Sequence, residues 1–244
     1  MINIQPCYAL VSGGKDSLST ACYLHEQGKL LGCVYLKTGI ATPDSLPFVH
    51  KTCSERGWPL DIYETQVSYD DLVIKYGFPG PVQHSMFMNY LKGRCIQQFK
   101  KVHPLMPLAS GVRTNESARR LLRAKAENMW EGVKVFAPII HWTTNETWAY
   151  FKAHNFERAP AYSTLQISGD CLCGAFARED EPAAIRTHYP EVWKRITALQ
   201  VKVKKVHDLY WEWGWGWRAP RHKDQLELYG CAECGDTTVV AGKD

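Results

Sequence analysis

The sequence predicts an α/β fold with a parallel sheet, followed by a small cysteine-bearing subdomain at the C-terminus. Over the first two thirds of the 244 residues, short apolar segments alternate with helix-compatible runs, which is the pattern of parallel strands joined by crossover helices. Beyond about residue 160 this alternation is lost, and glycine, cysteine, tryptophan and basic residues become more frequent. We therefore expect an α/β domain over residues 1–160 and a Cys-rich, Trp-rich basic subdomain over residues 161–244.

Five short segments rich in apolar residues are predicted to be strands. The second of them is nearly continuous in apolar character, as expected for a strand that both faces of a parallel sheet bury. The predicted strands are residues 8–11, 30–36, 60–65, 105–111 and 133–136.

Helices are predicted between the strands and near the C-terminus. Asp44 or Ser45 suits the N-cap of one helix, and Thr143 or Thr144 suits the N-cap of another, with Glu146 available in its first turn. The predicted helices are about residues 15–27, 44–57, 83–101, 143–154 and 190–210.

The composition is that of an ordinary globular protein, with 45% hydrophobic and 22% charged residues. The longest apolar runs are too short to cross a bilayer, and residues 1–6 lack the basic start and apolar core of a signal peptide. We therefore expect a cytoplasmic protein without a membrane partner. The formal net charge of +4 allows an anionic substrate and does not require nucleic acid.

The stretch Ser12-Gly13-Gly14-Lys15-Asp16-Ser17 lies between the first predicted strand and the first predicted helix. Paired glycines let the backbone approach a phosphate, and the N–H groups of a helix N-terminus face an anion. Lys15 adds a positive charge, and the glycine spacing differs from that of a Walker A motif. The stretch therefore predicts a phosphate site; the alternative is a plain glycine-rich turn.

A second anion-binding surface is predicted where the fourth strand ends. Arg113 follows that strand, and Arg120 comes soon after it in a basic stretch. Arginine forks suit the oxygens of phosphate or sulfate. Glu116 is expected to orient Arg113 or to start the helix, and the alternative for the basic stretch is a solvated helix face.

The nine cysteines fall into two kinds. Cys7, Cys22, Cys33 and Cys53 stand singly among apolar neighbours, which predicts core positions. Cys95 is predicted to be a buried helix residue, and a fifth metal ligand or a sulfur carrier is left open as an alternative.

Four other cysteines form two close pairs, Cys171 with Cys173 and Cys231 with Cys234, and a glycine follows each pair. Such a glycine permits a tight turn whose N–H groups point at thiolate sulfurs. Four thiolates suffice for a [4Fe–4S] cluster or a tetrahedral zinc site. Redox-active thiols are the third alternative.

Four tryptophans alternate with other residues near the C-terminus: Trp211, Trp213, Trp215 and Trp217. In a strand, this period would place all four indoles on one face. We expect a packed aromatic patch there; a platform for a nucleobase or a shield for a cluster is the alternative.

Several stretches resemble, in the right order, the phosphoadenosine phosphosulfate reductase-like branch of the PP-loop ATP pyrophosphatase superfamily. They span about residues 7–162, and the most specific are Ser12–Ser17 and Gly111–Ser117. The resemblance implies an adenine nucleotide alpha-hydrolase-like (Rossmann-like, HUP) fold, ATP as ligand, Mg²⁺ held partly by Asp16, and a [4Fe–4S] cluster in preference to Zn²⁺. The nucleotide-binding residues that it implies are Ser12, Gly13, Gly14, Lys15, Asp16, Ser17, Thr38, Gly39, Gly111, Arg113, Glu116 and Arg120.

The chain also differs from sulfonucleotide reductases, as the resemblance describes them. Its PP-loop is intact, as in the ATP-using members. Glu233-Cys234-Gly235 resembles the reductase ending, but Asp236 follows and no histidine does. The comparison favours an enzyme that activates an acceptor with ATP.

We therefore expect an enzyme that adenylylates an acceptor, releases pyrophosphate and exchanges AMP for sulfur. Lys15 and Arg113 would stabilise the charge that develops at the α-phosphorus. One alternative is a sulfonucleotide reductase in which a thiolate such as Cys234 attacks sulfur; another is a non-catalytic nucleotide-binding protein with a structural four-cysteine zinc site. The acceptor, with nucleic acid as one option, the sulfur donor and a homo-oligomeric state are left open.

Overall fold

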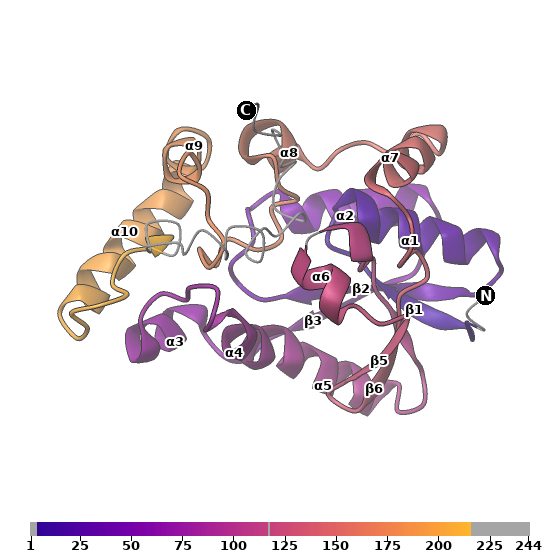
Figure 1. Cartoon of the computed structure of the whole chain (residues 1–244), viewed down its shortest axis with the longest axis horizontal. Helices are drawn as coiled ribbons and strands as arrows, with labels where there is room; N and C mark the ends of the chain where they lie inside the picture. The colour runs from indigo at the N-terminus through magenta and orange to yellow at the C-terminus, as the bar shows by residue number, and fades with distance from the viewer. Residues whose placement is uncertain (1–3, 117, 216–244) are drawn as a thin grey trace, which may run out of the picture.

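The computed structural model describes residues 4–116 and 118–215. These residues form a six-stranded sheet with the strand order β3-β2-β1-β4-β6-β5, and helices lie on both of its faces (Figure 1). All neighbouring strands are parallel except β5 and β6, so the predicted α/β fold with a mostly parallel sheet is confirmed. The strands are β1 (Cys7–Leu10), β2 (Leu30–Lys37), β3 (Leu60–Glu64), β4 (Leu108–Ala109), β5 (Glu127–Trp130) and β6 (Val133–Phe136).

Three helices cover one face of the sheet: α1 (Lys15–Glu26), α2 (Ser45–Glu55) and α7 (Thr144–Ala153). The start of α7 is fixed by the predicted cap. The Thr143 hydroxyl accepts a hydrogen bond from the Glu146 N–H at 3.2 Å, and the Glu146 carboxylate accepts one from the Thr143 N–H at 2.7 Å. This reciprocal capping box satisfies two N–H groups that a helix end otherwise leaves unpaired.

The other face carries α3 (Tyr69–Tyr76), α4 (His84–Met88), the π-helical turn η1 (Asn89–Gly93) and α5 (Arg94–Val102). The single helix predicted over residues 83–101 is therefore three consecutive segments. The predicted strand 105–111 is reduced to Leu108–Ala109, because proline supplies no N–H to a ladder and occupies positions 104 and 107. The antiparallel edge strand β5 was not predicted, since its residues carry no clear alternation.

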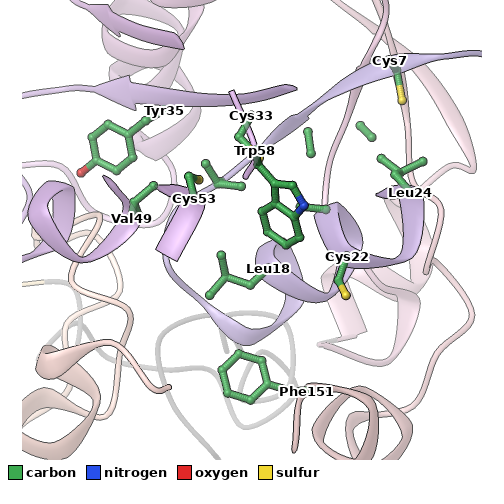
Figure 2. Packing of buried hydrophobic residues seen from close by; sticks show 14 of the residues in the cluster. Cys7, Leu18, Cys22, Leu24, Cys33, Tyr35, Val49, Cys53, Trp58 and Phe151 are labelled. Atoms are coloured by element: carbon green, nitrogen blue, oxygen red, sulfur yellow. The ribbon is translucent and has the colours of Figure 1, made fainter. Parts of the chain in front are cut away.

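A core of aliphatic, aromatic and cysteine side chains lies between the sheet and α1, α2 and α7 (Figure 2). The predicted core cysteines are all buried free thiols, which confirms that prediction: Cys7, Cys22, Cys33 and Cys53. Burial raises the pKa of Cys7 to about 12, although the nearby Lys29 acts in the opposite direction. A thiol of this kind stays protonated and packs as a small apolar group.

Cys95 is buried in α5, on the opposite face of the sheet, as predicted. Burial raises the pKa of its thiol to about 11. Within the part of the chain that the structure describes, Cys95 packs among apolar side chains that include Ile96 and Phe99. The structure therefore favours a core role for Cys95 over a role as ligand or sulfur carrier.

A second apolar core joins the α/β part of the chain to three C-terminal helices. These are α8 (Pro160–Leu165), α9 (Glu181–His188) and α10 (Pro190–Lys204). Ile40 and Phe87 pack in the same cluster as Ile185 and Leu199. The boundary between residues 160 and 161 stays a prediction, and the two sides of it share this core. No helix among the described residues is long and apolar enough to cross a membrane.

The segment 210–215 is a turn, not a strand, and its tryptophans pack in the second core, as the expected aromatic patch would. Its aromatic side chains face three glycines. A Cβ on Gly77 would lie 2.8 Å from Tyr210 Cβ, and one on Gly174 would lie 2.7 Å from Trp213 Nε1. A Cβ on Gly80 would likewise lie 2.4 Å from the Trp215 ring. The aromatic residues therefore occupy notches that only glycine leaves open, and Trp217 lies outside the described residues.

Candidate functional site

A cavity of about 630 Å³ lies over the carboxyl ends of the strands. This edge is where open α/β sheets hold their ligands. One wall is the Ser12–Ser17 loop with Gly111, and another is the α4–η1 segment with residues 167–177. The cavity therefore brings the predicted phosphate loop and the Cys171–Cys173 pair into one space.

Hydrogen bonds hold the Ser12–Ser17 loop in a fixed shape. The Ser17 hydroxyl donates to the Gly14 carbonyl at 2.9 Å, and its oxygen accepts from the Ser12 N–H at 3.1 Å. Gly13 has φ +81°, a conformation that favours glycine. Since α1 begins at Lys15, its unpaired first-turn N–H groups lie beside the loop, which suits an anion.

Asp16 is held between two cations. Its Oδ1 accepts a hydrogen bond from Arg113 Nε at 2.7 Å, and its Oδ2 lies 3.1 Å from Lys15 Nζ. Asp16 is 6% exposed and Arg113 is 1% exposed, and Arg113 Nη1 also donates to the Trp142 carbonyl at 3.2 Å. The pair connects the start of α1 to the segment after β4.

This geometry changes the role expected for Arg113. Because its side chain is buried behind Asp16, Arg113 is not placed to bind a phosphate in the cavity directly. It instead orients Asp16, which in turn contacts Lys15 on the cavity wall. Lys15 is therefore the cation of this group that reaches the cavity.

Gly111 is required where the two segments meet. A Cβ on Gly111 would lie 2.6 Å from the carbonyl carbon of Asp16 and 2.8 Å from the Ser17 nitrogen. Both contacts are with backbone, which cannot move aside as a flexible side chain can. The glycine that follows β4 thus allows the Arg113 segment to reach the phosphate loop.

Glu116 contacts Arg120, not Arg113. The Arg120 Nε atom lies 3.2 Å from Glu116 Oε2, and the Glu116 side chain is 1% exposed. The expectation that Glu116 orients Arg113 is therefore wrong: Asp16 does so. Glu116 instead ends the short helix η2 (Thr114–Glu116), ahead of α6 (Ala118–Arg123), and fixes Arg120 on the cavity wall.

The predicted site residues fall into three groups. Most line the cavity; five described ones do not, among them Thr38, which is buried, and Gly39, which is exposed and whose carbonyl accepts from Arg195 Nη1 at 2.7 Å. Cys231 and Cys234 lie outside the described residues. The predicted residues that line the cavity are Ser12, Gly14, Lys15, Asp16, Ser17, Gly111, Arg120, Cys171 and Cys173, and the described ones that do not are Gly13, Thr38, Gly39, Arg113 and Glu116.

At the other end of the cavity, the Cys171 thiol lies among polar groups. A hydrogen bond from Cys173 lowers the pKa of Cys171 well below its ordinary value; His84 and Lys92 act in the same direction and burial acts against them. Lys92 Nζ also lies 2.7 Å from Asp170 Oδ2, so the residue before Cys171 is tied to η1. Thiolate character at this end suits a metal ligand or a nucleophile.

Sequence reasoning did not identify His84, Lys92, Asp170 or Glu181, all of which line this cavity. Burial raises the pKa of Glu181 to about 7. His84 opens α4 after the proline–glycine break at residues 77–81, and Asp170 directly precedes the first ligand-like cysteine. In the sequence, only these two positions hint that His84 and Asp170 belong to the site.

The residues expected to bind Mg²⁺ and those expected to bind a cluster or zinc differ in how well they suit a metal. Both Asp16 oxygens already contact cations, so Asp16 is a poor ligand for Mg²⁺. Within the described ranges no three His, Cys, Asp or Glu side chains converge as a metal site. Cys171 and Cys173 could supply two of the four thiolates, and the [4Fe–4S] or Zn²⁺ site stays a prediction that depends on Cys231 and Cys234.

A sequence relative among known proteins matches only part of this chain. It is 32% identical over 104 residues to an uncharacterized 37.8 kDa protein in the gpa 5' region of Escherichia phage 186, an alignment that covers 37% of this chain and 30% of the phage protein. The chain thus matches less than one third of that relative's length.

Solved structures of similar arrangement have low sequence identity. One is phosphoadenylyl-sulfate reductase from Candida auris, with TM-score 0.47, 15% identity and coverage of 64% of this chain and 76% of that one. Another is FMN adenylyltransferase from Candida glabrata, with TM-score 0.47, 16% identity and coverage of 92% of this chain and 77% of that one.

The phosphoadenosine phosphosulfate reductase domain matches residues 6–168, a range that includes the phosphate loop, Gly111 and Arg113. The chain therefore belongs to the phosphoadenosine phosphosulfate reductase domain family, within the superfamily that the PP-loop suggested.

Proposed function

We propose that the protein is a PP-loop enzyme that uses ATP to adenylylate an acceptor for sulfur transfer. The observation that carries the proposal is that the Ser12–Ser17 loop and the Cys171–Cys173 pair line the same cavity. A nucleotide on the loop and a sulfur-handling group at the cysteines would then face a common acceptor.

The chain's own residues have distinct roles in this proposal. The Ser12–Ser17 loop and the first turn of α1 bind phosphate oxygens through N–H groups. Lys15 offsets the negative charge that develops at the α-phosphorus, an electrostatic role that requires a fixed position. The Arg113–Asp16 pair supplies that fixed position, because Asp16 contacts Lys15 at 3.1 Å.

The reaction proceeds in two steps. An acceptor oxygen attacks the α-phosphorus, the bond between the α-phosphorus and the bridging oxygen breaks, and pyrophosphate leaves. A hydrosulfide sulfur then attacks the activated carbon and forms a C–S bond, the C–O bond breaks, and AMP leaves with the acceptor oxygen. A cluster held by Cys171, Cys173, Cys231 and Cys234 would supply sulfur-binding iron at the far end of the cavity; a zinc ion there would supply structure alone.

Sulfonucleotide reduction is the second candidate, and the family match over residues 6–168 favours it. In that reaction a cysteine thiolate attacks the sulfonucleotide sulfur, and a second thiol releases sulfite. Cys234 is the cysteine predicted for the attack, and it lies outside the described residues.

The two candidates are separated by their products. The full chain is incubated with ATP and, separately, with a sulfonucleotide and a thiol reductant, while pyrophosphate and sulfite are measured. Pyrophosphate release that Lys15→Ala abolishes and Lys194→Ala preserves is expected, since Lys194 is exposed on α10. Sulfite release without pyrophosphate release would replace the first candidate by the second, and binding of nucleotide with neither product would indicate a non-catalytic protein.

A further inference from the structure

Arg158 stacks on aromatic rings, and it shares one of them with Lys15 of the phosphate loop. Its guanidinium lies 4.5 Å from the centre of the Trp148 ring and 5.3 Å from that of Tyr162. Lys15 Nζ lies 5.5 Å from the centre of the same Trp148 ring. The two cations are therefore at most 10.0 Å apart, which is the sum of their distances to that ring.

The position of Arg158 is determined by the elements around it. Trp148 belongs to α7, which packs against α1. Arg158 follows in the connection to α8, and Tyr162 of α8 lines the cavity. The guanidinium thus lies beside the ring of Tyr162, which forms part of the cavity wall.

Three of the cations that line the cavity are paired with carboxylates: Lys15, Lys92 and Arg120. Lys15 and Arg113 share Asp16, and Arg120 contacts Glu116. Arg158 is exposed and makes no ion pair with a carboxylate among the residues that the structure describes. Its neighbour Glu157 binds Lys51 instead, at 2.8 Å.

A guanidinium that stacks on aromatic rings keeps its edge N–H groups available. Stacking restricts the side chain without neutralising it. Such an arginine is prepared for bidentate binding of a phosphate. A nucleoside triphosphate on the loop carries several negative charges. Lys15 cannot balance them all, because it is already paired with Asp16.

We propose that Arg158 binds the outer phosphates of the nucleotide and the pyrophosphate that leaves. This inference rests on the proposed function, because it takes the Ser12–Ser17 loop as the site of the nucleotide. It has Lys15 of the loop and Arg158 of the α7–α8 connection bind the outer phosphates together. Arg158 is therefore expected to distinguish ligands by their outer phosphates.

Binding of AMP, ATP and inorganic pyrophosphate to the full chain tests this assignment by calorimetry. Arg158→Ala should weaken the binding of ATP and of pyrophosphate roughly tenfold or more, as for a lost charge-assisted hydrogen bond, and leave AMP binding unchanged. Arg158→Lys should recover part of the loss, since it keeps the charge but not the fork. The matched control is Arg186→Ala, at an exposed position of α9.

Unchanged pyrophosphate binding in Arg158→Ala, or equal weakening of AMP and ATP, would overturn the inference whatever the reaction is. Arg158-dependent pyrophosphate binding in a chain that does not release pyrophosphate from ATP would support the inference and overturn only the proposed reaction. Circular dichroism and urea unfolding of both Arg158 variants, compared with the Arg186 control, show whether a loss of binding reflects a loss of folding.

Discussion

Arg113 Nε donates a 2.7 Å hydrogen bond to Asp16 Oδ1, across a separation of 97 residues in the chain. The bond joins the segment after β4 to the first turn of α1. Both side chains are buried, so the ion pair is shielded from water. The shape of the phosphate loop is therefore set partly from outside the loop.

Asp16→Asn is expected to lower both stability and activity. It leaves the buried Arg113 guanidinium without a balancing charge, which costs about 3–5 kcal/mol of the free energy of unfolding. Urea denaturation measures that cost, and pyrophosphate release measures the loss of a positioned Lys15. Glu64→Gln is the control, because its pair with Lys37 is exposed and should change stability by about 1 kcal/mol or less. An equal cost for the two variants would contradict a structural role for the buried pair.

Gly111→Ala is expected to displace the phosphate loop. The added methyl group would overlap the backbone of Asp16, and overpacking of this kind costs about 1–3 kcal/mol. Nucleotide binding should weaken by more than the stability loss alone explains, because the shift falls on the loop itself. The control is Gly93→Ala in η1, where a Cβ would meet the flexible Glu131 side chain at 3.2 Å. Normal nucleotide binding by Gly111→Ala would show that the close contact is not needed for the site.

Glu181 is expected to make the protein less stable as the pH rises. Its folded pKa is raised from 4.5 to about 7 by burial, so the folded state holds the proton more tightly than the unfolded state does. The unfolded state then binds fewer protons between those values, and the free energy of unfolding falls as the pH rises through them, by on the order of 3 kcal/mol.

Urea denaturation at about pH 5 and about pH 8 tests the role of Glu181. Glu181→Gln should remove most of this pH dependence, and Glu179→Gln, at an exposed position nearby, should keep it. The same slope in both variants would assign the pH dependence to other groups.

Cys171→Ser is expected to remove bound metal if the four predicted cysteines share one site. The full chain, purified without oxygen, is assayed for iron and zinc and for visible absorbance. Cys22→Ala provides the control, since Cys22 is a buried core thiol of α1. Stoichiometric zinc and no colour would favour a structural site over a cluster, and equal metal content in the two variants would exclude Cys171 as a ligand.

The sequence predicted what depends on local pattern. The Ser12–Ser17 loop, the Thr143–Glu146 capping box and the buried strand β2 all follow from neighbouring residues. The pairing of Asp16 with Arg113 could not be predicted in the same way, because it depends on how β4 packs beside β1. The sequence alone suggests Asp16 as a ligand for Mg²⁺ and Arg113 as a ligand for phosphate, whereas in the fold each binds the other.

At the cysteine end of the cavity, too, the sequence does not predict the contacts between distant segments. Cys171 and Cys173 were identified from their spacing, but His84 and Lys92 approach from a helix about 80 residues earlier in the sequence. A π-helical turn at Asn89–Gly93 sets the direction of Lys92, and helical periodicity does not reveal such a turn. Trp213 likewise meets Gly174 through tertiary packing, not through a strand.

The core that joins Ile40 and Phe87 to Ile185 and Leu199 has a consequence for the matched family domain. The matched family domain ends at residue 168, and side chains on both sides of that point fill one apolar cluster. Replacing the C-terminal helices alone would uncover apolar side chains such as Ile40 and Phe87. The matched domain therefore depends on the helices beyond residue 168 to cover part of its apolar surface.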